Sequence, residues 1–196
     1  MAIYLTADWH LGDQRLDLLQ RPFTSPSEMA RALVQEHNQL VSPSDELIVV
    51  GDVCVIPDAL ELVALFQGQK TLIRGNKDRL FSDEELAPYF DRIIAEGEGL
   101  ELEIAGLPLF ATHYPTRASS DRFNLVGHIH TSWKVQKNML NVGVDVHHFK
   151  PLPLARVPFY LAAIEGYYDD DVWVSDHPAN RAHQGRGRAG SYFPPR

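Results

Sequence analysis

The hydrophobic positions in the first half of the chain alternate between short apolar runs and segments with helical spacing. Short runs predict buried strands at residues 2–7, 46–50 and 70–73. Helical spacing is set by Met29, Leu33, His37 and Leu40. We expect this helix to begin at the N-cap Ser27, a second helix to cover residues 57–67, and a short one to begin at Ser82. This alternation predicts a parallel sheet with crossover helices.

The pattern changes after Arg92, where short strands follow one another with turn residues between them and little room for helices. Such runs occur at residues 92–96, 100–106, 107–112, 123–128 and 139–145. They predict a second sheet that is antiparallel or mixed. A last short helix is expected to start near Pro158. The rest is rich in Gly, Pro, Asp and Arg, so we expect a folded domain over residues 1–167 and a loosely docked or disordered tail over 168–196.

Composition narrows the class of protein. The 196 residues are 44% hydrophobic and 22% charged, which is typical of a globular protein. No apolar stretch approaches the roughly 20 residues of a membrane helix, and the N-terminus does not resemble a signal peptide. Cys54 is the only cysteine, which excludes an internal disulfide and favours a reducing, cytoplasmic location. The net charge of −8 argues against broad binding to a nucleic-acid backbone, although it does not exclude a local basic groove.

Metal-ligating residue types follow five of the apolar runs, at the points where the runs end. They are Asp8 and His10 after the first run, then Asp52, Asn76 and His113, and finally His128 and His130. Because the carboxyl ends of strands line the ligand crevice in sheet-based folds, these side chains are expected to meet at one rim. Mixed oxygen and imidazole ligands suit Mn, Fe, Zn, Co or Ni, and Mn²⁺ is the preferred choice. Seven ligands fit two ions about 3.5–4 Å apart that share one carboxylate.

Each of these residues also has an ordinary structural interpretation. An Asp-x-His pair often shapes a turn, and Asp52 is a possible helix N-cap. Asn76 and Asp78 suit a turn. The two histidines of "GHIH" would share one face of a strand whatever their role. The joint pattern of five strand ends favours the metal site over these separate explanations.

The blocks "DWH", "GD", "GNKD", "TH" and "GHIH" resemble the five motifs of the calcineurin-like metallophosphoesterase superfamily, from Asp8 to His130. Small bacterial and phage phosphoesterases are further similar in "HYP" and in "NVGVD…KPLPL". The resemblance implies an α/β fold that forms a four-layer α/β/β/α sandwich of two mixed sheets. It implies a first ion on Asp8, His10, Asp52 and His130. A second would lie on Asp52, Asn76, His113 and His128, with Asp52 bridging.

The same resemblance implies that the protein hydrolyses phosphoesters by attack of a hydroxide shared by the two ions. Arg74 would neutralise phosphate charge, and Asp78 would accept a hydrogen bond that orients a ligand or the loop. The chain departs from the family at Lys77, where many members carry a histidine that stabilises the phosphate or protonates the leaving group. Lysine is poorly matched to acid catalysis at neutral pH but can act as a fixed charge. The candidate catalytic residues are therefore Asp52, Arg74, Asn76, Lys77, Asp78 and His113.

Relatives that lack this histidine often favour phosphodiesters or activated esters, so we expect a small phosphodiester or nucleotide-like substrate. A phosphomonoesterase or protein phosphatase of the same fold, a metal-binding interaction module without catalysis, and a nuclease remain alternatives. Neither a long nucleic acid nor a membrane is an expected partner. Trp9 and His37 are expected to pack in the core, and Cys54 to be a buried structural thiol.

Overall fold

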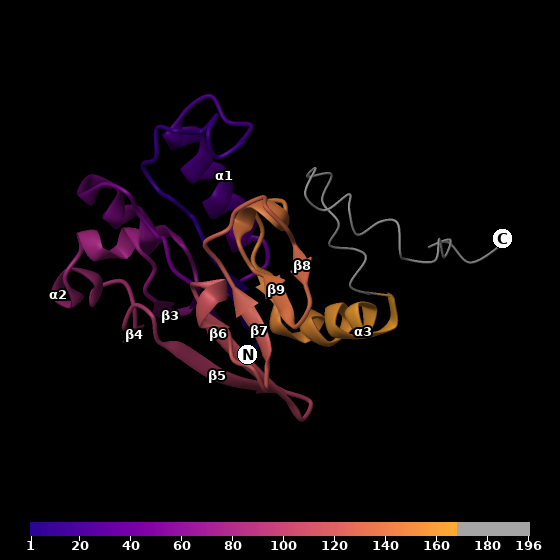
Figure 1. Ribbon diagram of the computed structural model, residues 1–196. Helices are drawn as coiled ribbons and strands as arrows, with labels where there is room; N and C mark the ends of the chain where they lie inside the picture. The colour runs from indigo at the N-terminus through magenta and orange to yellow at the C-terminus, as the bar shows by residue number, and fades with distance from the viewer. Residues whose placement is uncertain (168–196) are drawn as a thin grey trace.

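The computed structural model describes residues 1–167, which form an α/β fold with two mixed sheets and few helices (Figure 1). The predicted tail, residues 168–196, lies outside the described residues. The α/β class and the two sheets are therefore confirmed, and the domain boundary stays a prediction.

The first sheet has the order β10-β1-β2-β3-β4. Its strands are β1 (Ile3–Thr6), β2 (Glu46–Val49), β3 (Gln69–Ile73), β4 (Arg92–Ile94) and β10 (Leu152–Pro153). Strands β1 to β4 run parallel, and β10 is antiparallel to β1. The parallel sheet predicted for the first half of the chain is thus confirmed. The assignment of residues 92–96 to the second sheet was wrong, because β4 continues the parallel order beside β3.

The second sheet has the order β5-β6-β7-β9-β8 and is mixed. Its strands are β5 (Gly99–Ile104), β6 (Leu107–Thr112), β7 (Phe123–Val126), β8 (Val135–Gln136) and β9 (Met139–Asn141). Strand β5 is antiparallel to β6, whereas β6, β7 and β9 run parallel to one another. Three of its strands therefore end at the same edge of the sheet.

The first helix, α1 (Pro26–Asn38), begins two residues earlier than expected. Its N-cap is Ser25, whose side chain accepts a hydrogen bond from the Glu28 amide at 3.1 Å, so the predicted cap at Ser27 was wrong. Proline suits the first helical turn because it has no amide hydrogen to leave unpaired. The predicted start at Ser82 is confirmed by α2 (Asp83–Leu86), and the last helix by α3 (Val157–Tyr167).

Residues 57–67 do not form an α-helix. They contain the 3-10 helix η1 (Pro57–Leu65), which opens on the predicted proline. The remaining 3-10 helices are η2 (Lys77–Leu80), η3 (Pro115–Arg117), η4 (Val144–Val146) and η5 (Leu154–Arg156). A continuous helical spacing alone does not distinguish these two helix types over a short segment.

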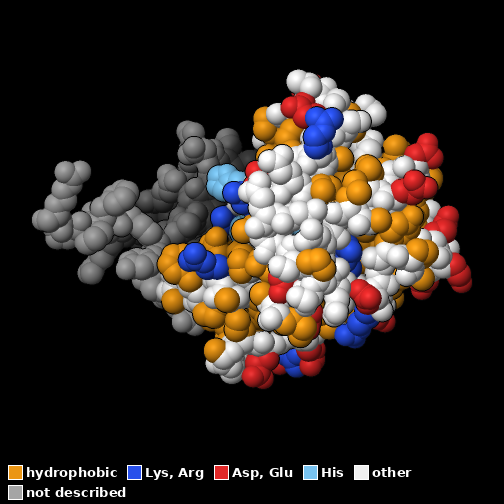
Figure 2. Space-filling model, turned by 180° about the vertical axis from the view of Figure 1, so that it is seen from behind, with side chains coloured by type: hydrophobic (Ala, Val, Ile, Leu, Met, Phe, Trp, Pro, Cys, Tyr) orange, Lys and Arg blue, Asp and Glu red, His pale blue; other side chains and the backbone are white. Residues whose placement is uncertain are grey.

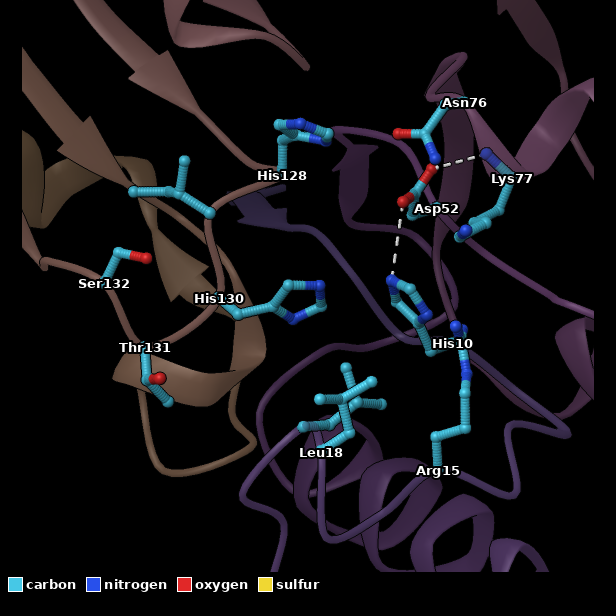
Figure 3. A pocket seen from close by; sticks show the side chains of 12 residues that line it. His10, Arg15, Leu18, Asp52, Asn76, Lys77, His128, His130, Thr131 and Ser132 are labelled. Carbon is cyan, nitrogen blue, oxygen red and sulfur yellow. Dashed lines mark hydrogen bonds and ion pairs between the residues drawn. The ribbon is translucent and has the colours of Figure 1, made fainter.

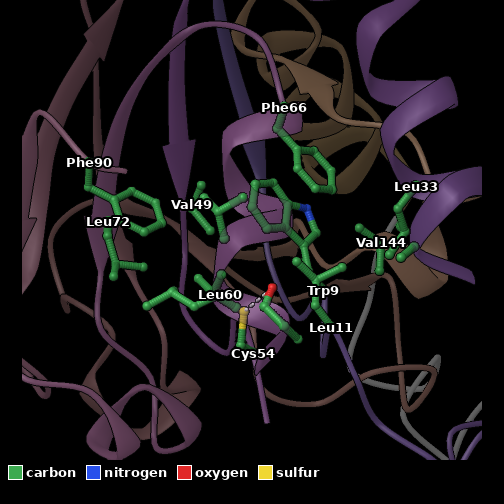
Figure 4. Close-up of a cluster of buried hydrophobic side chains, with 14 of the residues drawn as sticks. Trp9, Leu11, Leu33, Val49, Cys54, Leu60, Phe66, Leu72, Phe90 and Val144 are labelled. Carbon is green, nitrogen blue, oxygen red and sulfur yellow. Dashed lines mark hydrogen bonds between the residues drawn. The ribbon is translucent and has the colours of Figure 1, made fainter. Parts of the chain in front are cut away.

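One hydrophobic core lies between the first sheet and the helices α1 and η1 (Figure 4). Trp9 stacks on Phe66 there, with ring centroids 4.0 Å apart, and its indole nitrogen donates to the Thr6 hydroxyl. Cys54 is fully buried in the same cluster, and burial raises the pKa of its thiol far above the ordinary value. The expected structural roles of Trp9 and Cys54 are confirmed.

A second core fills the space between the two sheets. Leu5, Ile48 and Ile73 of the first sheet lie in one cluster with Leu109 and Leu125 of the second. This arrangement is compatible with an α/β sandwich. At the edge of the second sheet, α3 packs beside β8. The four-layer arrangement stays a prediction.

No helix among residues 1–167 combines the length and the apolar character that crossing a membrane requires. The face seen from behind in Figure 2 shows lysine and arginine side chains scattered among acidic and hydrophobic ones, without a continuous basic stripe.

His37 makes the stability of the fold sensitive to acid. It is 2% exposed, and its Nε2 donates to the Gln67 carbonyl at 2.8 Å. Burial lowers the pKa of His37 from 6.5 to about 4. The unfolded chain therefore binds a proton at higher pH than the folded one, so this stabilising contribution is present above pH ~6.5 and lost as the pH falls toward about 4.

We expect the free energy of unfolding to fall by about 3 kcal/mol from this group between pH ~6.5 and ~4. Urea titrations across that range measure the fall. His37→Gln, which keeps an amide donor, should flatten the pH dependence, whereas His148→Gln at an exposed site should leave it unchanged. An unaltered slope in His37→Gln would contradict this explanation.

Candidate metal centre

The loops after five strands meet where the two sheets adjoin. Strands β1, β2 and β3 end at one edge of the first sheet, and β6 and β7 end at the adjoining edge of the second. Backbone hydrogen bonds join these loops: the Asp8 amide donates to Gly51, and the Gly127 amide donates to His113. A bridge between Ala7 and Gly143 joins the two sheets. The loops that carry the candidate ligands are therefore held against one another.

The structure brings candidate ligand side chains together in two groups. Two groups of ligand atoms each lie within 4.8 Å of one another: Asp8, His10 and His130 in one, and Asp52, His113 and His128 in the other. Asp52 lies between the groups. Its Oδ2 is 3.4 Å from His10 Nε2 (Figure 3), and its Oδ1 is 3.5 Å from His113 Nε2. Asn76 Oδ1 lies 3.4 Å from His113 Nε2. All seven candidate ligands thus belong to one cluster.

Three of the histidines have a defined tautomer. His113 Nδ1 is 2.8 Å from the Val50 carbonyl, His10 Nδ1 is 3.1 Å from Asp13, and His130 Nδ1 is 2.8 Å from Asp145. Because carbonyl and carboxylate oxygens only accept, each Nδ1 must carry a hydrogen. Each Nε2 is left as the atom that faces the cluster.

The Nε2 atoms of two histidines in the cluster face oxygen atoms of Asp52 and Asn76. His10 Nε2 is buried and has no hydrogen-bond partner within the described part of the chain. It faces a carboxylate oxygen of Asp52, and His113 Nε2 faces oxygens of Asp52 and Asn76. Buried groups of this kind are costly unless paired. Histidines fixed through Nδ1 by a carbonyl or carboxylate are the usual ligands of divalent metals. The donor set therefore fits divalent ions.

Burial acts on both carboxylates of the cluster. Asp8 is fully buried, and desolvation raises its pKa to about 8 even though His130 and the His128 amide act in the opposite direction. Desolvation also acts to raise the pKa of Asp52, but His10, His113 and the Lys77 amide outweigh it and hold the pKa below its ordinary value. A cation beside Asp8 would favour its ionised form.

The backbone at the cluster is strained. Five of the seven candidate ligands have positive φ: Asp8 at 60°, His10 at 50°, Asp52 at 56°, His128 at 75° and His130 at 49°. Residues other than glycine rarely adopt this region, at a cost of order 1–3 kcal/mol each. Such strain persists where surrounding contacts impose it and is typical of functional sites.

Gly75 allows the loops after β2 and β3 to approach closely. A Cβ atom there would lie 2.4 Å from Asp52 Oδ1 and 2.8 Å from His113 Cε1, which is closer than such atoms approach. Any other residue would displace the central carboxylate or the imidazole.

The sequence analysis missed a buried pair behind His130. Arg21 donates through Nε and Nη2 to Asp145, whose Oδ2 also accepts from His130. The Arg21 and Asp145 side chains are 0% and 2% exposed. Arg21 also donates to the backbone carbonyls of Asp8 and Trp9. Asp145 lies in "NVGVD", within η4 and four residues after β9 ends, and nothing in the local sequence pairs it with Arg21.

Asp78 has the orienting role expected of it. Its carboxylate accepts from the amides of Asp52 at 2.8 Å, Val53 at 2.9 Å and Gly75 at 2.7 Å. It therefore clamps the loop after β2 to the loop after β3. Burial raises the pKa of Asp78 to about 6 despite these hydrogen bonds.

Arg74 does not occupy the expected position beside the cluster. Its guanidinium donates to Asp83 and to the backbone carbonyls of Asp78 and Phe81, and it lines a different cavity. Because these contacts hold it away from Asp52 and Asn76, its geometry fits a structural role and not the expected phosphate contact. Lys77 is closer: its amide donates to Asp52 Oδ1 at 2.8 Å, and its side chain lines the same cavity as Asp52 and Asn76.

A cavity of about 540 Å³ opens over the cluster (Figure 3). It is lined by His10, Arg15, Leu18, Leu19, Asp52, Asn76, Lys77, His128, Ile129, His130, Thr131 and Ser132. Five of the seven candidate ligands line this cavity, namely His10, Asp52, Asn76, His128 and His130. A small molecule could therefore contact the cluster directly.

Comparisons with known proteins give a fold but no activity. No family model matches the chain. An uncharacterized protein of Methanocaldococcus jannaschii is 26% identical over 168 residues, covering 78% of this chain and 86% of that protein. The crystal structure of a protein of unknown function from Aquifex aeolicus has a TM-score of 0.64 at 19% identity, covering 81% of this chain and 98% of that one. The two chains share the fold.

A structure described as a novel archaeal phosphodiesterase has a TM-score of 0.45 at 18% identity. It covers 73% of this chain and 84% of that one. At this TM-score we infer nothing from it.

The Asp145 carboxylate should matter for metal binding although it is not a ligand. Asp145→Asn keeps the size of the side chain but removes the charge that holds the His130 imidazole and balances Arg21. We expect the affinity for Mn²⁺ to fall about 10–100-fold. Titration calorimetry measures this, with thermal melting to confirm that the variant folds. Asp121→Asn, at an exposed position, is the matched control. Equal affinities in the wild type and Asp145→Asn would exclude this role.

Proposed function

We propose that the protein is a metal-dependent hydrolase of phosphoesters that uses two divalent ions, Mn²⁺ being the preferred metal. The observation that carries the proposal is the position of Asp52 between two groups of imidazole and carboxylate ligands. The resemblance of the five motif blocks supports the same activity, and the acceptor-rich chemistry of the cluster supports the metal.

Asp8, His10, Asp52 and His130 would hold one ion, and Asp52, Asn76, His113 and His128 the other. When bound, such a pair lowers the pKa of a water molecule and neutralises the charge of a phosphate group. The chain supplies the geometry for this chemistry. Asp13 and Asp145 orient the imidazoles of His10 and His130 through their Nδ1 hydrogens.

Lys77 supplies positive charge for the phosphate. Its side chain lines the cavity beside Asp52, and its amide holds the Asp52 carboxylate in place. Lysine neutralises charge well but is a poor proton donor at neutral pH. A substrate whose leaving group departs without a proton is therefore favoured, which supports phosphodiesters and nucleotide-like esters over simple alkyl monoesters.

The other functions have less support. A phosphomonoesterase or protein phosphatase would use the same cluster, but the family histidine that protonates the leaving group is replaced by Lys77. A metal-binding interaction module is disfavoured because all seven ligand positions are present. A nuclease that acts on long polymers would need a basic surface for the nucleic-acid backbone. The net charge of −8 disfavours this, and the face in Figure 2 shows no continuous basic stripe. We also propose a cytoplasmic location, because a chain with a single cysteine forms no internal disulfide and suits a reducing compartment.

Leaving-group dependence tests the role of Lys77. We expect a nitrophenyl ester to be hydrolysed much faster than the matching methyl ester, by about 10²-fold or more, because no acid of matched strength protonates the leaving oxygen. Steady-state kinetics on the two esters measure the ratio. Equal rates would remove the argument for activated or diester substrates.

The activity itself is tested with bis(p-nitrophenyl) phosphate, p-nitrophenyl phosphate and single-stranded DNA, with and without Mn²⁺. We expect Mn²⁺-stimulated turnover that is fastest on the diester. Asp52→Asn should reduce turnover about 10³-fold, a loss of the size seen when one stabilising group is removed from an active site. Thermal melting should show the variant folded, and Asp121→Asn should retain activity. Absence of turnover with every divalent metal would favour the interaction module instead.

A further inference from the structure

The cavity over the cluster extends beyond the candidate ligands. Its remaining lining comes from Arg15, Leu18, Leu19, Lys77, Ile129, Thr131 and Ser132. A volume of about 540 Å³ is in the range of pockets that hold whole small-molecule ligands. A single phosphate group would occupy only part of it. The cavity therefore has room for a portion of the substrate that does not react.

Arg15 is held rigidly at this cavity. Its Nε donates to Asp13 Oδ1 at 2.9 Å and its Nη2 to Asp13 Oδ2 at 2.7 Å, and its backbone amide donates to Oδ1 as well. Asp13 is 2% exposed, whereas the Arg15 side chain is 50% exposed. The buried carboxylate thus anchors one edge of a guanidinium whose other edge is free to meet a ligand.

The second edge of the guanidinium has the geometry for an oxoanion. The structure gives Arg15 Nη1 no partner among residues 1–167, so Nη1 and the remaining hydrogen of Nη2 form a fork of two donors. Such a fork matches two oxygens of a phosphate or carboxylate. Figure 3 shows Arg15 extending toward His10, with Leu18 lying nearby in the same lining. Because Asp13 already fixes the side chain, little conformational entropy would be lost on binding.

Arg15 adjoins the candidate ligand His10 through their shared partner Asp13, but it is far more exposed than the ligands. Among the residues that line the cavity, His10 and Asp52 are each 2% exposed, whereas the Arg15 side chain is 50% exposed and Leu18 is 72% exposed. The charge near Asp52 is already supplied by Lys77. An anion that reaches Arg15 would therefore be a group distinct from the phosphoryl group at Asp52.

We propose that Arg15 binds a second phosphate group of the substrate, one that does not react. This inference rests on the proposed function. The substrate class is a phosphoester that carries a further phosphate, such as a nucleotide with two phosphate groups. Its apolar or base portion would lie against Leu18, Leu19 and Ile129.

Ligand affinity, measured separately from hydrolysis, tests this inference. Calorimetry on the Mn²⁺-loaded protein compares thymidine 5′-monophosphate with thymidine 5′-diphosphate and thymidine 3′,5′-bisphosphate. We expect at least one of the two-phosphate ligands to bind about 10-fold or more tightly than the monophosphate. Arg15→Met should reduce this ratio to about one, because a charge-assisted bidentate contact is worth that factor. Arg15→Lys should restore part of the ratio, since it returns the charge without the fork.

Arg122→Met is the matched control, because Arg122 also pairs with a carboxylate, that of Glu101, but lies outside the cavity. It should keep the wild-type ratio. If Arg15→Met weakens all three ligands equally, Arg15 acts only through Asp13 and His10 and the inference is overturned. An unchanged ratio overturns it too. Discrimination through Arg15 in a protein that hydrolyses no phosphoester would sustain this inference and defeat the proposed function. Hydrolysis of phosphoesters without discrimination through Arg15 would sustain the proposed function and overturn this inference.

Discussion

A buried carboxylate with an imidazole nitrogen on either side is the constraint on which the rest of the structure depends. Asp52 lies 3.4 Å from His10 Nε2 and 3.5 Å from His113 Nε2, and both imidazoles already donate through Nδ1 to other acceptors. Lone pairs and carboxylate oxygens packed in this way repel one another in a medium of low dielectric constant. Divalent cations at these two groups would remove that repulsion.

The fold maintains this arrangement by contacts that lie outside the ligand cluster. Parallel strands bring their carboxyl ends to one edge, and the loops that follow are bent into positive φ at five ligand positions. Asp78 ties the loops after β2 and β3 together through three amides. The buried Arg21–Asp145 pair holds the His130 imidazole and the carbonyl of Asp8. Removing any of these supports would leave a polar group unpaired in the interior, which is costly.

The sequence predicts the ligands better than their supports. Residues such as Asp8, His113 and His130 follow apolar runs, and the carboxyl ends of parallel strands must meet, so their convergence could be inferred from spacing alone. Arg74 also follows a strand, but it donates to the Asp78 and Phe81 carbonyls at η2 and to Asp83 of α2. Spacing along the chain carries no information on such contacts. The Arg21–Asp145 pair joins positions 124 residues apart, so no local pattern reveals it. Strand β4 was misplaced because a three-residue run carries no signal for which sheet it joins.

The central claim is that Asp52 is shared by two divalent ions. Electron paramagnetic resonance of the protein loaded with Mn²⁺ tests it most directly, because two ions that share a carboxylate couple magnetically. The account predicts the spectrum of a coupled pair, with hyperfine lines more closely spaced than those of an isolated ion, and its replacement by an uncoupled spectrum in Asp52→Asn. A wild-type spectrum of isolated ions alone, at every metal loading, would contradict it.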